Sequence, residues 1–178
     1  MALKATIFKA RLQIADMDRD YYAEHGLTLA RHPSETDERM MVRLLAFALN
    51  AHDQLAFTRG LSSDDEADLW QHSLSGEIEH WIEVGVPAED RIRKACARAD
   101  RVTVYAYGQR TAPVWWQKLE SAVQRYRNLN VFFLPPETCD ALAGLAARNM
   151  DLNATIQDAQ VWLASDAQSV EVQSQVWK

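Results

Sequence analysis

The chain opens with alternating apolar and polar residues, and this pattern predicts that it starts in β structure. Residues 3–15 (LKATIFKARLQIA) alternate over much of their length, as expected of a strand with one buried face. A short second strand is expected over 27–31. The spacing of apolar residues then changes to that of a helix. Ser34 can cap this helix, and Asp37, three residues later, would complete a weak capping box. Apolar residues continue along one helical face to about Ala51, so the first helix is expected to end there.

The middle of the chain predicts short strands and then an alternation of strands and helices. Strands are expected at 54–58, 68–72 and 78–84, and Ser75-Gly76 is a hairpin turn signal between the last two. The further expected elements are a helix from Pro87 to about Ala99, a strand at 101–107, a helix at 112–126, a strand at 129–134, a short helix at 137–147, and two or three strands from Met150 to Trp177. Parallel neighbours need crossover helices. We therefore expect an α/β fold, with a mixed sheet flanked by helices and extra antiparallel strands.

The composition is that of an ordinary globular protein. The chain has 178 residues, of which 48% are apolar, so we expect a single domain over 1–178 and a monomer. Cys96 and Cys139 have no metal-ligand spacing, and Cys96 falls on an apolar helix face as a buried free thiol. The start of the chain lacks the apolar region of a signal peptide, and no run reaches the length of a membrane helix. These features predict a cytoplasmic protein that does not bind membranes.

Charge is unevenly distributed along the chain. The net charge is −6, so no global basic field attracts nucleic acid. Residues 61–90 nevertheless carry nine acids and no Lys or Arg, whereas residues 91–127 carry nine bases and two acids. An acidic half beside a basic half fits a metal cluster bordered by a phosphate-binding rim. Segregation of surface charge by chance explains the pattern equally well.

Glu38 and Asp68 are the first two of three acids whose positions suggest a site. Glu38 shares a helical face with apolar residues, where a carboxylate is costly unless it is paired or bound to metal. It could instead favour the positive end of the helix dipole from the wet end of that face. Asp68 opens a strand, and such an aspartate is often a turn or capping residue.

Glu83 is the third acid, and it lies near the end of a strand that is covered on both faces. The carboxyl end of a strand that precedes a helix is where α/β sheets bind ligands. An edge position reaching solvent, or an ion pair with Arg91 or Arg93, are the alternatives. His80 points to the opposite face and is predicted to be a core or capping histidine. The three acids together would suit Mg²⁺, which takes carboxylate oxygens, waters and substrate phosphate.

Several long strings of the sequence resemble one bacterial family. These strings are MALKATI, LTLARHPSETDERMMVRLLAFAL, FTRGLSSDDEADLW, HWIEVGVPAEDRIRKAC and LNATIQD. They resemble the YaeQ family over essentially the whole chain, and the order of elements and acids is similar to the PD-(D/E)XK nuclease superfamily. The resemblance implies a restriction-endonuclease-like core, a variant of the nuclease fold. It implies no established activity.

The resemblance also suggests roles for the three acids. Asp68 would stand for the motif aspartate, Glu83 for the second acid, and Glu38 for the acid of the first helix. The motif lysine is replaced by Gly85. In a phosphodiesterase this lysine orients the attacking water and offsets developing charge.

Some members of the superfamily supply that cation from the following helix, where the candidates are Arg91, Arg93 and Lys94. Lys94 is the catalytic candidate, although it lies nearly opposite the helix's buried face. Arg91, Arg93 and Arg98 are candidates to bind nucleic acid.

Two functions follow from these expectations. The first is Mg²⁺-dependent hydrolysis of phosphodiester bonds in nucleic acid. The alternative is a non-catalytic module on a degenerate nuclease fold that binds nucleic acid or a protein of the transcription machinery through residues 91–127. The missing lysine favours the alternative.

Overall fold

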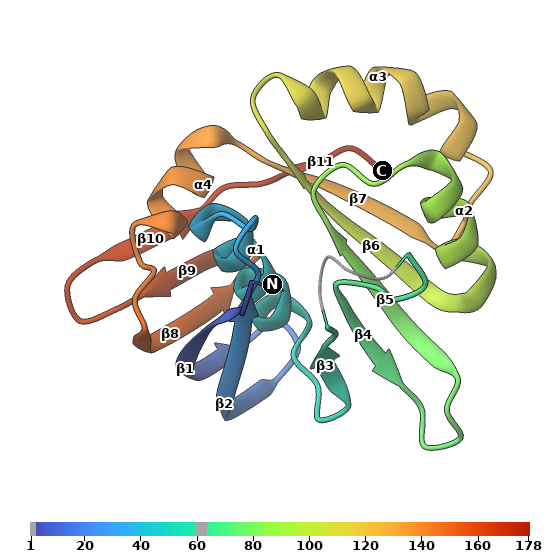
Figure 1. Ribbon diagram of the computed structural model, residues 1–178. Helices are drawn as coiled ribbons and strands as arrows, with labels where there is room; N and C mark the ends of the chain where they lie inside the picture. Colours follow the sequence, from blue (N-terminus) through green and yellow to red (C-terminus); the bar gives the residue numbers. More distant parts are fainter. Residues whose placement is uncertain (1–2, 60–63) are drawn as a thin grey trace. The chain divides into compact units, whose positions relative to one another are not determined.

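The computed structural model describes residues 3–59 and 64–178, and the chain divides into two compact units (Figure 1). Unit 1 comprises the described residues up to Ala48 together with Glu137–Gln173. Unit 2 comprises the described residues of Leu49–Pro136 together with Ser174–Lys178. Each unit contains one mixed β-sheet. The expected α/β class is therefore confirmed, while the expectation of a single domain stays a prediction.

Unit 1 is built on a five-stranded sheet. Its elements are β1 (Thr6–Asp16), β2 (Tyr21–Arg31), most of α1 (Asp37–Asn50), most of α4 (Pro136–Ala143), β8 (Asn149–Gln157), β9 (Gln160–Ala164) and β10 (Ser169–Val172). The strand order is β10-β9-β8-β1-β2, and all neighbours are antiparallel except β1 and β8. Every second side chain of β1 is buried from Phe8 to Ile14, which confirms the alternation expected of this strand.

Unit 2 is built on a six-stranded sheet. Its elements are β3 (Leu55–Phe57), β4 (Leu69–His72), β5 (Ile78–Val84), α2 (Glu89–Arg98), β6 (Ala99–Tyr107), α3 (Thr111–Val123), β7 (Leu129–Leu134) and β11 (Gln175–Val176). The strand order is β11-β7-β6-β5-β4-β3. The strands β5, β6 and β7 are parallel and the other neighbours are antiparallel. The predicted alternation of strands and helices over residues 78–134 is thus confirmed.

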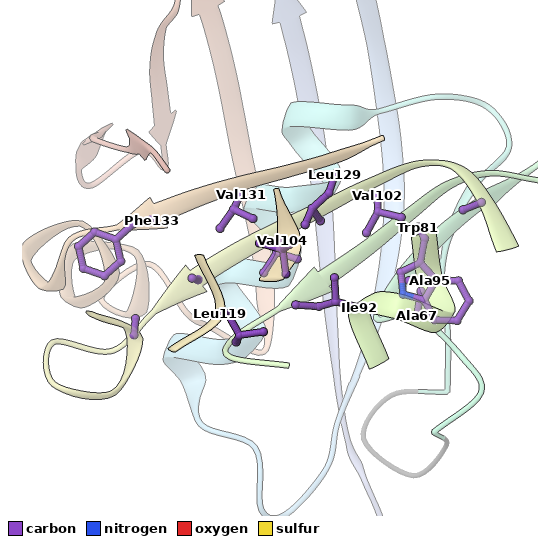
Figure 2. Packing of buried hydrophobic residues seen from close by; sticks show 14 residues of the cluster. Ala67, Trp81, Ile92, Ala95, Val102, Val104, Leu119, Leu129, Val131 and Phe133 are labelled. Atoms are coloured by element: carbon purple, nitrogen blue, oxygen red, sulfur yellow. The ribbon is translucent and has the colours of Figure 1, made fainter. Parts of the chain in front are cut away.

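One face of the unit 2 sheet carries the core that positions the site. Side chains of α2 and α3 pack against β5, β6 and β7 there (Figure 2). Ile92 and Leu119 are the main helical contributions, and Trp81 is the largest buried side chain of the cluster. Strand β6 is buried from Val102 to Ala106 without interruption, because both of its faces are covered.

Three local expectations need correction. The structure has two mixed sheets where one was expected, because β1 pairs with the distant β8 and not with the strands of unit 2. Strand β2 starts six residues before the expected strand, since Tyr21–Gly26 contains no buried side chain and so gives no apolar alternation. The cap of α1 is Thr36 and not Ser34: the Thr36 hydroxyl accepts the N–H of Arg39 at 3.1 Å.

Two other expectations concern the cysteines and membranes. Both cysteines are free thiols; Cys139 is buried, and Cys96 is half-buried where full burial was expected. Within residues 3–59 and 64–178, no helix is long and apolar enough to cross a membrane.

Candidate functional site

The structure brings together Asp68, directly before β4, and Glu83 on β5 of unit 2. Strand β4 pairs antiparallel with β5 so that Leu69 faces Ile82. Asp68 directly precedes this pair, and its charge acts on Glu83. The backbone N–H of Asp68 donates to the carbonyl of Ile82 at 3.0 Å. The Oδ2 atom of Asp68 accepts the backbone N–H of Val84 at 2.7 Å. The Asp68 carboxylate thus takes the place of a backbone hydrogen-bond acceptor for β5 just before β4 begins, and this bond fixes the position of the carboxylate.

Both acids are buried, and the charge of Asp68 acts on Glu83. Asp68 is 5% exposed and Glu83 is 3% exposed. Burial, and then the nearby charge of Asp68, raise the pKa of Glu83 to about 7, against the opposing effects of Arg91 and Trp81. A carboxyl group with this pKa is part-protonated near neutrality. Two like charges held in one place form a local excess of negative charge that a cation would relieve.

Glu83 already has two hydrogen-bond donors. Its Oε1 atom accepts the indole Nε1–H of Trp81 at 2.6 Å and the Nε–H of Arg91 at 2.8 Å. The Arg91 side chain is 23% exposed, so this ion pair lies between the interior and the surface. The ion pair with Arg91 that the sequence left open is therefore present, and the edge position open to solvent is not.

Arg91 and Arg98 fasten the segment before Asp68 to α2. The guanidinium of Arg91 also donates to the carbonyl oxygens of Asp64 at 3.2 Å and Glu66 at 2.5 Å. Arg98 donates to the carbonyl of Asp65 at 3.0 Å. Its guanidinium also lies 5.2 Å from the ring centroid of Trp81. These two arginines make contacts within the protein.

The other basic candidates of α2 lie on its exposed side. Arg93 is paired with Asp90 at 2.9 Å, and its side chain is 57% exposed. Lys94 is exposed as well. Ile92 and Ala95 form the buried face of the helix, as the sequence predicted. Arg91 is therefore the basic side chain of α2 for which the structure records a hydrogen bond to Glu83.

Gly85 shows why no lysine stands at the motif position. Its φ is +107°, a region that side-chain-bearing residues rarely adopt. A Cβ placed there would meet nothing within 4 Å, so the backbone conformation, and not crowding, disfavours a larger residue. The N–H of Gly85 donates to the carbonyl of Tyr105 at 2.9 Å. The strand thus ends with a turn at the position where the motif has its lysine.

Glu38 lies in unit 1, and its surroundings belong to that unit. It is half-buried in the first turn of α1. Burial, and then the charge of Asp140 on α4, raise its pKa above the usual value. Across residues 3–59 and 64–178, no group of three or more His, Cys, Asp or Glu side chains is arranged to hold a metal ion. The pair Asp68–Glu83 is therefore the part of the expected site that the structure assembles, and the three-acid site stays a prediction.

Sequence reasoning did not find a buried ion pair in unit 1. Arg43 donates to both carboxylate oxygens of Glu35 at 2.7 and 2.8 Å, and both residues are buried. Arg39 adds a third contact to Glu35 at 3.1 Å. A signal was available, because Arg43 interrupts an otherwise apolar run of α1. The discounted His80 is a core histidine, 1% exposed, as predicted.

The fold and the acid pair define the class of protein to which the chain belongs. It is a mixed α/β protein with two sheets and a buried pair of carboxylates where β4 and β5 begin to pair. A family model described as YaeQ protein matches residues 1–174. The uncharacterized protein YaeQ of Escherichia coli strain K12 is 47% identical over 178 residues, covering 100% of this chain and 98% of that protein. A relative of the same name in Salmonella typhi is also 47% identical. The chain belongs to the YaeQ family.

Two crystal structures of YaeQ proteins have the same fold. That of Xanthomonas axonopodis pv. citri has a TM-score of 0.93 and 51% sequence identity, over 97% of each chain. That of Pseudomonas syringae has a TM-score of 0.93 and 40% identity, over 98% of this chain and 96% of that one. The predicted family is thus confirmed along almost the whole length of the chain.

Proposed function

We propose that unit 2 has a restriction-endonuclease-like core and that this chain hydrolyses phosphodiester bonds in nucleic acid with a divalent cation held by Asp68 and Glu83. The buried pair of carboxylates carries the proposal. Its support is the order β3-β4-β5-α2-β6, which resembles the PD-(D/E)XK core. The first motif acid falls at the start of β4 and the second on β5.

The donor set suits Mg²⁺, which commonly takes one or two carboxylates and completes its shell with water and substrate phosphate. The raised pKa of Glu83 is caused first by burial and then by the charge of Asp68, and a bound cation would offset that charge. When bound, such an ion would activate water and stabilise the charge that develops on phosphate.

The residues of α2 supply the positive charge that Gly85 cannot. Arg91 donates to Glu83 and orients its carboxylate. Arg91 is the side chain we assign to the charge-offsetting part of the motif lysine's role. Lys94 and Arg93, on the exposed side of the helix, are assigned to contacts with flanking phosphates, together with Arg98.

Cation binding and cleavage are tested together, on the wild type, Glu83→Gln and Asp68→Asn. Calorimetric titration with Mn²⁺ or Mg²⁺ should give heat with the wild type only. A cation at tenfold its Kd should raise the free energy of unfolding by about 1.4 kcal/mol.

Single- and double-stranded DNA and RNA should be cleaved in a cation-dependent way. Glu79→Gln, on the same strand and also hydrogen-bonded, is the matched control. Cleavage that persists in Glu83→Gln, or no heat and no stabilisation in the wild type, would overturn the proposal.

One observation favours a second function, a non-catalytic binding module. Arg91 forms an ion pair with Glu83, and Gly85 leaves the motif without its lysine. This module would bind nucleic acid or a protein of the transcription machinery through the basic region 91–127. Binding should then weaken with salt and survive Glu83→Gln. Charge reversal at Arg93 and Lys94 should abolish it, and binding unchanged by both reversals would exclude this region.

A further inference from the structure

Strand β2 forms one edge of the unit 1 sheet, where it pairs with β1 over all of its 11 residues. Among residues 3–59 and 64–178, no other strand pairs with it. Natural proteins protect such edges with short strands, proline, lysine or bulges. Strand β2 is long, contains no proline or lysine, and pairs with β1 in an unbroken register. Its free side is therefore a template to which another strand can add.

The register shows which backbone groups of β2 face this free side. The N–H of Lys9 on β1 donates to the carbonyl of Arg148, directly before β8. Odd-numbered residues of β1 therefore turn their N–H and C=O groups toward β8, and even-numbered residues turn theirs toward β2. Ala10 of β1 pairs with Leu27, so the odd-numbered residues of β2 turn toward β1. The groups that face outward belong to the even-numbered residues: Tyr22, Glu24, Gly26, Thr28 and Ala30.

A hydrogen bond supports this assignment of the outward groups. The carbonyl of Ala30 accepts a bond from the Arg43 side chain at 3.3 Å, and Arg43 lies on α1, outside the ladder of β1 and β2. The other outward backbone groups have no hydrogen-bond partner in the part of the chain that the structure describes. A row of donors and acceptors is thus left along β2.

A second copy of β2 fits this row of groups. Gly26 is the middle residue of the row, so antiparallel pairing about a two-fold axis at Gly26 matches every outward residue with another. Glu24 then pairs with Thr28 of the second copy, and Tyr22 pairs with Ala30. Two hydrogen bonds in each pair give about ten, as in a typical protein interface. Gly26 leaves the axis uncrowded, because nothing lies within 4 Å of the position where its Cβ would stand.

The exposed apolar side chains of β1 and β2 would also cover one another in this pairing. Tyr22 is 60% exposed and Ile7 is 44% exposed. Within one copy they lie at opposite ends of the two strands, because Tyr22 pairs with Ala15 and Ile7 pairs with Ala30. In the two-fold pairing, Tyr22 stands beside Ala30 of the second copy, and Ile7 follows in the next strand of the same row. The small Ala30 side chain leaves room for the tyrosine ring to reach Ile7.

The charges match in the same way. Glu24 would stand beside Thr28 of the second copy, and Thr28 pairs with Lys9 in its own sheet. Glu24 and Lys9 are then two strand spacings apart, or about 10 Å between their Cα atoms, which two long side chains can span. Lys9 forms no ion pair among the described residues, so it is available for this contact. The symmetry makes the contact twice.

The other acids of this face lie away from the seam between the copies, since Asp151 is on β8 and Glu171 is on β10. An extended peptide of unrelated sequence would match neither the charges nor the exposed apolar side chains. We infer that the β2 strands of two copies pair about Gly26, so that the protein is a two-fold dimer with one continuous sheet across the two copies of unit 1. This dimer replaces the monomer expected from the composition. It uses neither the acid pair nor the basic region 91–127, so it stands or falls separately from the proposed function.

Sedimentation equilibrium of the full chain over a range of concentrations measures the Kd of the dimer. Wild type should reach twice the mass of one chain. Glu24→Lys brings two cations together at each contact and Lys9→Glu brings two acids together, so either variant alone should raise Kd by about tenfold or more. A mixture of the two variants restores an opposite charge at both contacts. The mixture should therefore form a heterodimer with close to the wild-type Kd.

Gly26→Pro removes the N–H at the two-fold axis and no hydrogen bond of the ladder with β1. It should abolish the dimer while circular dichroism reports folded protein. The control is Glu171→Lys, the same charge reversal on β10 at the other edge of the sheet, which should leave Kd unchanged. Three results would overturn the inference: wild type with the mass of one chain at every concentration, a mixture of the variants that dimerises no better than either alone, or a Kd that Glu171→Lys raises and Glu24→Lys does not.

Discussion

His80 makes the fold sensitive to acid, and its hydrogen bonds explain how. It is 1% exposed in β5, its Nε2 atom lies 2.8 Å from the hydroxyl of Thr103, and a guanidinium nitrogen of Arg101 lies 3.0 Å from its Nδ1 atom. A guanidinium can only donate, so Nδ1 must accept and Nε2 must carry the proton that bonds Thr103. A second proton on Nδ1 would point at the Arg101 cation. Burial, followed by the charge of Arg101, lowers the pKa of His80 to about 3.

The sign of the pH effect follows from comparing the folded and unfolded states. The ordinary pKa of histidine is 6.5, so above that pH the side chain is neutral in both states and has no effect. Between pH 6.5 and 3 the unfolded chain binds a proton that the folded chain does not. The free energy of unfolding therefore falls by about 1.4 kcal/mol for each pH unit in this range. At pH 4.5 the loss is about 2.7 kcal/mol, a large share of the stability of an ordinary domain.

Urea unfolding of the wild type and His80→Gln between pH 7.5 and 4.5 measures this effect. Glutamine does not titrate, and its amide can still donate to Thr103. The variant should be less stable at pH 7.5 by about 1 kcal/mol because its hydrogen bonds fit less well. The wild type's advantage should shrink as pH falls and reverse by pH 4.5, since other groups titrate equally in both proteins and cancel. A difference that stays constant over this range would show that His80 is not the group responsible.

Three further predictions concern stability. Trp177→Ala should cost about 2 kcal/mol and lower the melting temperature by calorimetry, because this half-buried ring stacks 4.5 Å from Phe133; an unchanged melting temperature would contradict that contact. Gly108→Ala should cost more than about 1 kcal/mol in urea unfolding, because φ is +112° and the new Cβ would clash with the side chain of the residue that begins α3. Arg43→Met should cost about 3 kcal/mol by leaving the buried Glu35 with Arg39 as its remaining ion-pair partner, and adding Glu35→Leu should recover much of that loss; no recovery would refute the ion-pair explanation.

Elements whose signal is local could be predicted from the sequence. The bounds of β5 and β7 are those expected, because each carries several large apolar residues between clear turn or cap signals. The turn at Ser75-Gly76 is also present, with φ of +92° at Gly76. The first half of β2 was missed, since its side chains are exposed or half-buried in alternation and it is held by backbone pairing with β1.

The division into two sheets could not be predicted, because it depends on pairing between distant segments. Residue 9 of β1 pairs with residue 149 of β8, and no local pattern in either strand specifies that partner. Glu38 lies in unit 1 and the other two acids lie in unit 2. The sequence showed three acids spaced 30 and then 15 residues apart, but intervals along the chain do not determine which sheet a residue joins.

The acid pair itself depends on a single irregularity that the sequence does not mark. At the hairpin between β4 and β5, His72 pairs with Ile78, and continuing that register would place Asp68 opposite Ile82, on the sheet face away from Glu83. The register shifts by one residue between Gln71 and His72, so that Leu69 pairs with Ile82. Extended by one residue, this shifted register places Asp68 on the same face as Glu83, whose pKa its charge raises. A slip of one residue turns every later side chain of a strand to the other face. The bulge therefore decides whether two carboxylates share a site or lie on opposite faces of the sheet. Because the turn residues locate the hairpin but not the bulge, the sequence could name the two acids without showing that they meet.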